Sequence, residues 1–230
     1  MTYPVALRED PAIREKWDSH GRARRHYGST FVCEVVTDSP LYELGLRMQD
    51  EVVRRGIAHN YGMLPPSSYH MTVADGLKLP LYVGQADRWP AELRDLPFTE
   101  AASIMRQRLV EAAIPAPKPL EMAVTGVHPL EQSLTVLLGS ATSEVAAELS
   151  RFRNAVYDAL GMNVADVDGY QFHMSLGYRL TEPDAAAEPL AELYELFTGW
   201  AAEVERADLE PVGFCVFADM YSFPQILRYS

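Results

Sequence analysis

The sequence has few cysteines, no long apolar run and no excess of basic residues, and each lack argues against a class of protein. Its two cysteines, Cys33 and Cys215, lie in apolar stretches without a CxxC pattern, which favours buried, reduced thiols over a disulfide. No apolar run approaches the length of a membrane span, and the first residues lack the apolar core of a signal peptide. We therefore expect a cytoplasmic protein without a membrane partner.

The charge balance argues against binding of long nucleic acids. The chain has 20 Lys and Arg residues against 32 Asp and Glu residues, a net charge of -12. Because binding to long nucleic acids relies on neutralisation of phosphates by basic residues, DNA is not an expected partner. A local pocket can still hold a small anion, and the acidity itself favours solubility. With 48% hydrophobic residues, the chain can bury a sizeable core.

The order of apolar and polar segments predicts an α+β fold with two lobes around a central cleft. Consecutive strands favour antiparallel pairing over a doubly wound sheet, and helices are expected to flank a pseudo-twofold pair of antiparallel or mixed sheets. Residues 1–28 are expected to form an irregular arm, and residues 29–230 a single bilobal domain with an insertion at about 75–98. Strands are expected near 29–36, 67–74, 119–129, 133–140, 170–178 and twice within 211–229, and helices near 39–56, 99–113, 143–161 and 184–205.

Two short stretches about a hundred residues apart are nearly the same. They read SSYHMTV at residues 67–73 and YQFHMSL at residues 170–176. Each contains an aromatic residue, a histidine, a methionine, a hydroxyl residue and an aliphatic residue in that order, and each lies on a strand predicted to follow a helix. We interpret the repetition as one functional site built from two matching strands.

Side chains alternate between the two faces of a strand, so each repeat separates an apolar face from a polar one. His70 and Thr72 share a face in the first repeat, as do His173 and Ser175 in the second. Across a cleft they would present two imidazoles and two hydroxyls to one ligand. An imidazole has an unperturbed pKa of about 6.5, so one ring can accept a proton while the other donates one. The hydroxyls can hold phosphate oxygens and stabilise developing charge.

Zinc binding is the main alternative use of two histidines. Zinc would need a further ligand, for which Asp75 and Asp168 are near enough in sequence. A hydroxyl two residues after each histidine is not a zinc-ligand pattern, so we expect neither a metal nor another cofactor. The other histidines lack that hydroxyl and are interpreted as surface or structural residues: His20, His26, His59 and His128.

The pair YHMTV and FHMSL resembles the His-x-Thr/Ser motifs of the two-histidine (2H) phosphoesterase superfamily, which includes 2′,3′-cyclic nucleotide phosphodiesterases and RNA ligase relatives. SSYHMTVADG followed by DRWP also resembles a poorly characterised bacterial and fungal branch. With the element order, the resemblance spans most of residues 29–227. It implies a bilobal α+β fold and metal-independent hydrolysis or transfer at a cyclic phosphate or phosphodiester.

By motif position, the resemblance makes His70 and His173 the catalytic acid/base pair, and Thr72 and Ser175 the phosphate-binding hydroxyls. The expected partner is a small phosphate-containing substrate such as a nucleotide or a short RNA end. The insertion at about 75–98 is long, so the substrate cannot be transferred from better-known branches. The oligomeric state is left open.

Three further residues are candidates for substrate binding. Tyr178 has the parity of the core-facing residues of its strand, so it reaches the ligand only if a bulge at Gly177 turns it. Arg88 and Trp89 lie in the insertion, where a guanidinium could bind a phosphate and an indole could stack on a base. For Trp89 the alternative is that the ring anchors the loop.

Two other functions compete with a phosphoesterase. One is a non-catalytic module that binds a nucleotide or another phosphorylated ligand in the same cleft. The other is a structural or interaction protein in which the histidines are incidental. Turnover, saturable binding without product, or no binding of 2′,3′-cyclic nucleotides distinguishes the three.

Overall fold

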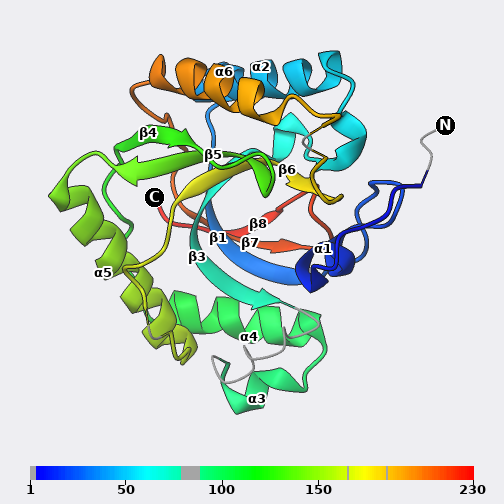
Figure 1. Cartoon of the computed structure of the whole chain (residues 1–230). Helices are drawn as coiled ribbons and strands as arrows, with labels where there is room; N and C mark the ends of the chain where they lie inside the picture. Colours follow the sequence, from blue (N-terminus) through cyan, green and yellow to red (C-terminus); the bar gives the residue numbers. More distant parts are fainter. Residues whose placement is uncertain (1–3, 79–88, 165, 185) are drawn as a thin grey trace.

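A computed structural model of the chain describes residues 4–78, 89–164, 166–184 and 186–230 (Figure 1). Within these ranges eight strands form one sheet, and every strand pair is antiparallel. The strand order is β4-β5-β6-β3-β1-β7-β8, and β2 pairs with β6. The strands are β1 (Gly28–Glu34), β2 (Tyr61–Met63), β3 (His70–Lys78), β4 (Met122–Val127), β5 (Ser133–Ser140), β6 (His173–Arg179), β7 (Gly213–Phe217) and β8 (Gln225–Arg228).

The longest helices begin and end where the sequence predicts. Ser39 caps α2 (Pro40–Arg54) by accepting a hydrogen bond from the Tyr42 backbone N–H, and a proline occupies the first helical position. Thr142 caps α5 (Ser143–Leu160), which ends at Gly161 in the left-handed conformation. The other helices are α1 (Pro11–Lys16), α3 (Ala91–Arg94), α4 (Phe98–Glu111) and α6 (Leu190–Ala202), with 3₁₀ turns at Ala58–Asn60 and Pro66–Ser68.

The sheet has two halves that meet at the two motif strands. We call β2, β4, β5 and β6 the β6 half, and β1, β3, β7 and β8 the β3 half. A single residue pair, Met71 with Met174, joins β3 to β6. The α+β class and the antiparallel pairing are therefore confirmed, and the two expected sheets are continuous through this narrow join.

Each half is covered by a helix that follows a strand of the other half. Helix α2 follows β1 in sequence but lies with α6 over the β6 half, and α5 follows β5 but lies with α4 against the β3 half (Figure 1). An approximate twofold relation between the two halves of the sheet would place both helices in this crossed arrangement. The apolar side of each motif strand thereby faces helices, which leaves its polar side for a pocket.

Residues 4–28, the described part of the segment predicted as an irregular arm over residues 1–28, include regular structure. They contain α1, and the fully buried Trp17 forms the centre of a second, smaller core. A Cβ on Gly62 would lie 2.6 Å from the Trp17 ring, so β2 can receive this indole only at a glycine. A six-residue helix and one tryptophan carry too little periodicity to be predicted from sequence.

Three further sequence expectations are tested by the described residues. Cys33 and Cys215 are both buried and unbridged, as predicted, and burial raises the pKa of each thiol to about 12. Helix α4 begins at Phe98 after Pro97, one residue before the start expected near residue 99. None of the described helices is both long and apolar enough to cross a bilayer.

Candidate active site

The two motif strands show the same alternation of burial. In β3, His70 and Thr72 are half-buried while Met71 between them is fully buried. In β6, His173 and Ser175 are likewise half-buried. The predicted separation of an apolar and a polar face is therefore confirmed in both repeats.

A bulge follows each motif and brings a further residue to the polar face. Val73 in β3 and Leu176 in β6 have no cross-strand partner on β1 and β5, respectively. Each extra residue shifts the alternation by one position. Asp75 and Tyr178, five residues after their histidines, consequently line the pocket. The bulge lies next to Gly177, and it turns the Tyr178 side chain toward the pocket, as the sequence analysis required for this residue to reach a ligand.

A helix side chain holds each bulge in place. Gln49 of α2 donates a hydrogen bond of 2.9 Å from Nε2 to the Leu176 carbonyl. Arg153 of α5 donates one to the Val73 carbonyl. The Leu176 carbonyl also accepts a hydrogen bond of 2.9 Å from the Leu64 backbone N–H, so Gln49 adds a second donor there. The same backbone position is anchored in both repeats by a helix that follows a strand of the other half.

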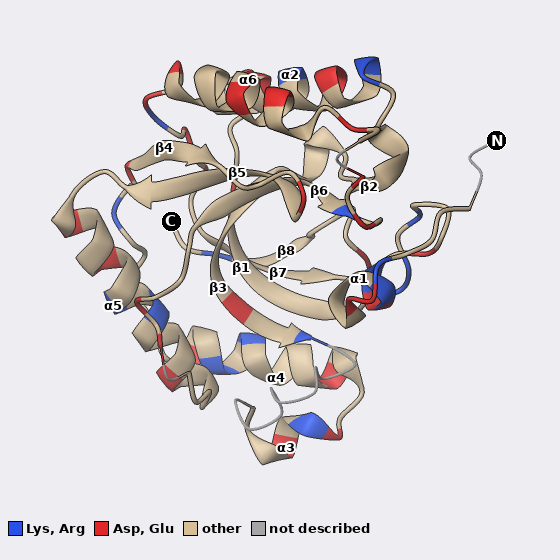
Figure 2. Ribbon diagram, viewed as in Figure 1, with Lys and Arg blue, Asp and Glu red and all other residues tan. Residues whose placement is uncertain are grey.

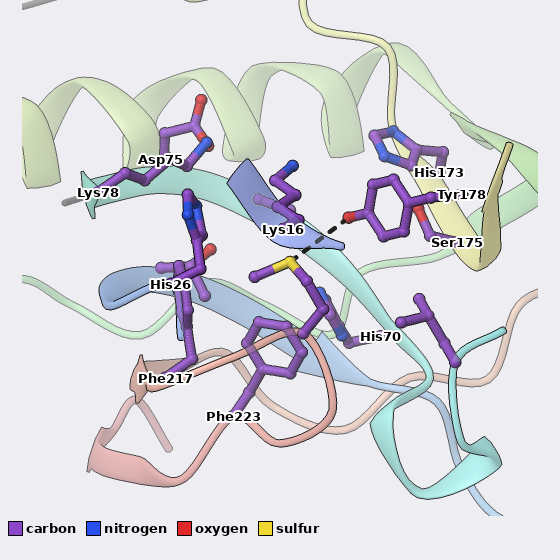
Figure 3. A pocket seen from close by; sticks show the side chains of 14 residues that line it. Lys16, His26, His70, Asp75, Lys78, His173, Ser175, Tyr178, Phe217 and Phe223 are labelled. Carbon is purple, nitrogen blue, oxygen red and sulfur yellow. Dashed lines mark hydrogen bonds and ion pairs between the residues drawn. The ribbon is translucent and has the colours of Figure 1, made fainter. Parts of the chain in front are cut away.

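The two motifs line one pocket (Figure 3). It contains about 600 Å³ of empty space, part of it open to solvent. The two histidines and the two hydroxyl residues of the motifs all line its wall. The lining residues are Lys16, His26, Thr30, Leu64, His70, Thr72, Asp75, Lys78, His173, Ser175, Tyr178, Phe217, Met220 and Phe223.

Both motif imidazoles are oriented in the same way. Nδ1 of His70 lies 2.6 Å from the Ser68 carbonyl, and Nδ1 of His173 lies 2.8 Å from the Gln171 carbonyl. A carbonyl only accepts hydrogen bonds, so we assign the proton to Nδ1 in each ring. Nε2 of each neutral ring is then a proton acceptor available to a ligand.

The two imidazoles differ in their surroundings. The pKa of His70 is lowered to about 4, chiefly by burial; the hydrogen bond to the Ser68 carbonyl opposes this shift, and the charge of His173 adds to it. The His70 ring lies against Phe223, with ring centroids 4.4 Å apart. The His173 ring stacks on Tyr170 instead, and its hydrogen bond to Gln171 is exposed to solvent. His70 is therefore neutral at pH 7, the state that a general base requires.

The pocket also contains residues that sequence reasoning missed. His26 was interpreted as a surface or structural residue, but it is buried in the pocket wall and stacks on Phe217 with centroids 6.1 Å apart. Lys16 and Lys78 reach the same pocket. No local pattern marks Lys16 or His26, because only folding of the N-terminal segment brings them to the sheet.

The structure corrects one substrate-binding prediction. Trp89 is buried in the main core and is not among the residues that line the pocket, so its ring is not placed to stack on a base there. Arg88 lies outside the described residues. Asp168, considered as a zinc ligand, lines a different hollow beside α5. Among the described residues no three His, Cys, Asp or Glu side chains cluster where they could hold a metal ion.

Two protein-family models match the chain, and each covers more than half of its 230 residues. Residues 16–133 match the family 2H-phosphodiest, described as a domain of unknown function (DUF1868). Residues 81–210 match the 2′-5′ RNA ligase superfamily. The sequence has no match among curated proteins.

Solved structures with a similar fold include a conserved protein of unknown function, ATU0111, from Agrobacterium tumefaciens strain C58. It is 26% identical with a TM-score of 0.78, over 94% of this chain and 90% of that chain. E. coli LigT complexed with 3′-AMP is 12% identical with a TM-score of 0.44, over 88% and 97% of the two chains. A phosphoesterase is 13% identical with a TM-score of 0.46, over 88% and 96%. On the strength of the two family matches, this chain belongs to the two-histidine phosphoesterase superfamily.

Proposed function

We propose that the protein is a metal-independent phosphoesterase that hydrolyses a cyclic phosphate or phosphodiester of a small nucleotide or an RNA end. Membership of the superfamily supports an enzyme of the phosphoesterase or ligase type. The observation that carries the finer proposal is the presence of two imidazoles and two hydroxyls in the wall of one pocket. They are the catalytic residues of the proposal: His70, Thr72, His173 and Ser175.

In the proposed reaction, the neutral Nε2 of His70 accepts a proton from a water molecule as its oxygen attacks phosphorus. The bond from phosphorus to the leaving ribose oxygen breaks, and protonated His173 gives its proton to that oxygen. Thr72 and Ser175 donate hydrogen bonds to the non-bridging phosphate oxygens, which gain charge in the transition state. The two rings exchange protonation states, and solvent restores them before the next turnover.

The surroundings of the two rings support this division of roles. His70 is the better base candidate because burial keeps it neutral. His173 is left as the candidate for the acid, and its hydrogen bond to the Gln171 carbonyl is exposed to solvent. General acid and base catalysis each contribute about 10²- to 10⁴-fold, so two imidazoles acting together supply a large acceleration without a metal.

A panel of 2′,3′-cyclic nucleotides, assayed with and without a chelator, tests the proposal. Formation of a nucleotide monophosphate at an unchanged rate in chelator is the expected result. Loss of turnover in chelator would replace the acid/base mechanism by a metal mechanism. Saturable binding with no product would favour the non-catalytic binding module. The isomer of the product reports which ribose oxygen leaves.

A further inference from the structure

The pocket has a second polar region beyond the catalytic residues (Figure 3). It consists of Lys16 from α1, His26 from the segment before β1, and Asp75 and Lys78 from β3. The chain has only three lysines, and two of them line this one pocket. Elsewhere, acidic and basic residues lie mainly on helices and loops, and most of the sheet is uncharged (Figure 2).

The charges in this region do not cancel. Nζ of Lys78 lies 2.7 Å from Oδ1 of Asp75, so these two groups neutralise each other. His26 contributes no charge at pH 7, because burial and the nearby lysines lower its pKa to about 4. No carboxylate in the described part of the chain forms an ion pair with Lys16. Its ammonium is the excess positive charge of this region, in a chain whose net charge is -12.

Lys16 also has surroundings that favour an anionic ligand. Its Nζ lies 4.8 Å from the centroid of the Tyr178 ring, and the side chain is half-buried. Contact with an aromatic face removes part of the water around an ammonium, so a bound anion would regain electrostatic energy there. The ring that Lys16 covers belongs to the same strand as Ser175. At about 3.3 Å per residue, the two positions on the strand are roughly 7–10 Å apart.

We propose that Lys16 binds a second phosphate of the substrate, while the catalytic residues hold the phosphate that reacts. The inference rests on the proposed function for that first phosphate. It narrows the substrate class to cyclic phosphates that carry a further phosphate about one nucleoside away, such as a nucleoside 2′,3′-cyclic phosphate with a 5′-phosphate. A polymer is not required, because the second group needs only one lysine.

Calorimetric titration with product-like nucleotides tests Lys16 without any turnover. The ligands are adenosine 3′,5′-bisphosphate and adenosine 3′-monophosphate, which differ only in the 5′-phosphate. We expect wild-type protein to bind the bisphosphate about tenfold more tightly or better, the usual effect of a charge-assisted contact. Lys16→Met should remove that preference and leave the affinity for the monophosphate nearly unchanged. Lys16→Arg should retain most of the preference.

Lys118→Met is the matched control, because Lys118 is exposed and lies outside the pocket. It should bind both ligands like wild-type protein. If wild-type protein shows no preference for the bisphosphate, or if Lys16→Met keeps it, the second phosphate site is refuted.

Kinetics separate this inference from the proposed function. With adenosine 2′,3′-cyclic phosphate and its 5′-phosphorylated form, Lys16→Met should raise KM about tenfold for the 5′-phosphorylated form alone and leave kcat unchanged. Equal KM values of wild-type protein and Lys16→Met for both substrates would refute the second site and preserve the phosphoesterase. Absence of turnover with a preserved, Lys16-dependent preference for the bisphosphate would refute the phosphoesterase and keep the site.

Discussion

The two motif strands are alike in geometry and differ in their surroundings. Each has a histidine whose Nδ1 lies within hydrogen-bond distance of the carbonyl two residues before it, and a hydroxyl residue two positions later. Each then bulges and is anchored by a helix side chain. Yet His70 is desolvated beside Phe223, whereas the hydrogen bond of His173 to its carbonyl is exposed. A duplicated backbone thus supplies two equal positions, and the neighbouring segments make them chemically unequal.

The helix side chains that anchor the two bulges also differ from each other. Gln49, which is neutral, donates to the carbonyls of both Leu64 and Leu176 at 2.8 and 2.9 Å. Arg153 is charged and buried, and its guanidinium lies 4.7 Å from the centroid of the Tyr170 ring. That ring also stacks on His173, so the anchor of the β3 half contacts a neighbour of the histidine in the β6 half.

Removing either imidazole should have the largest effect. His70→Ala and His173→Ala should each lower kcat at least about a hundredfold, because each removes a general acid or base. The double variant should be little worse than either single one, since residues that act as a unit are not additive. Steady-state kinetics on a substrate identified by the panel measures this. His59→Ala, at an exposed histidine, is the control. Full activity of either single variant would contradict the shared mechanism.

Removing the hydroxyls should cost less. Thr72→Val and Ser175→Ala each delete one hydrogen bond to the phosphate in the transition state, and kcat should fall by roughly one to three orders of magnitude. Thr72→Ser should recover most of the rate because it keeps the hydroxyl. If the two variants lose similar amounts of kcat, the hydroxyls of the two repeats contribute equally to binding the phosphate in the transition state. An unchanged kcat in both variants would show that the hydroxyls do not contact it.

The difference between the two histidines can be reduced by exposing His70. A general base must be neutral, and burial lowers the pKa of His70 to about 4, so activity should persist below the ordinary histidine pKa of about 6.5. Phe223→Ala lets water reach the ring and should raise that pKa toward 6.5. The acidic limb of kcat/KM should then move to higher pH, with a loss of about tenfold at pH 5.

NMR titration of the His70 imidazole checks the cause directly. The His70 resonances should titrate at higher pH in Phe223→Ala than in wild-type protein. Tyr194→Ala removes an exposed aromatic side chain on α6 and should leave the His70 titration and the pH profile unchanged. An acidic limb that stays in place while the His70 titration moves would assign the base to another group.

Removing the bulge anchors should produce the smallest change. Arg153→Met removes the buried helix donor to the Val73 carbonyl and should lower the free energy of unfolding by about 1–3 kcal/mol. Gln49→Met should cost less, about 0.5–1.5 kcal/mol, because the Leu176 carbonyl keeps its hydrogen bond from the Leu64 backbone N–H. Urea unfolding measures both losses. Arg151→Met is the control on α5, because Arg151 is exposed and its ion pair with Glu148 should contribute about 0–1 kcal/mol. If the anchor variants lose no more free energy of unfolding than Arg151→Met, the bulges keep their shape without the helix donors.

Much of the fold and the proposed catalytic residues could be predicted from sequence because both rest on local periodicity. Residues two apart on a strand share a face in any fold, so the histidines and hydroxyls were found from the two repeats alone. Caps and apolar stripes likewise located α2 and α5. Tyr178 could be predicted only conditionally, because a bulge is not visible in the strand that carries it.

The amino-acid sequence by itself determined which residues can perform acid/base chemistry and which face of each strand displays them, since a strand alternates its side chains whatever surrounds it. Only the tertiary structure decided that Trp89 belongs to the core, that the N-terminal segment brings Lys16 and His26 to the pocket, and that Phe223 lies against His70. These outcomes depend on contacts between segments far apart in the chain. Desolvation depends on the same contacts, and it is desolvation that separates one imidazole from the other.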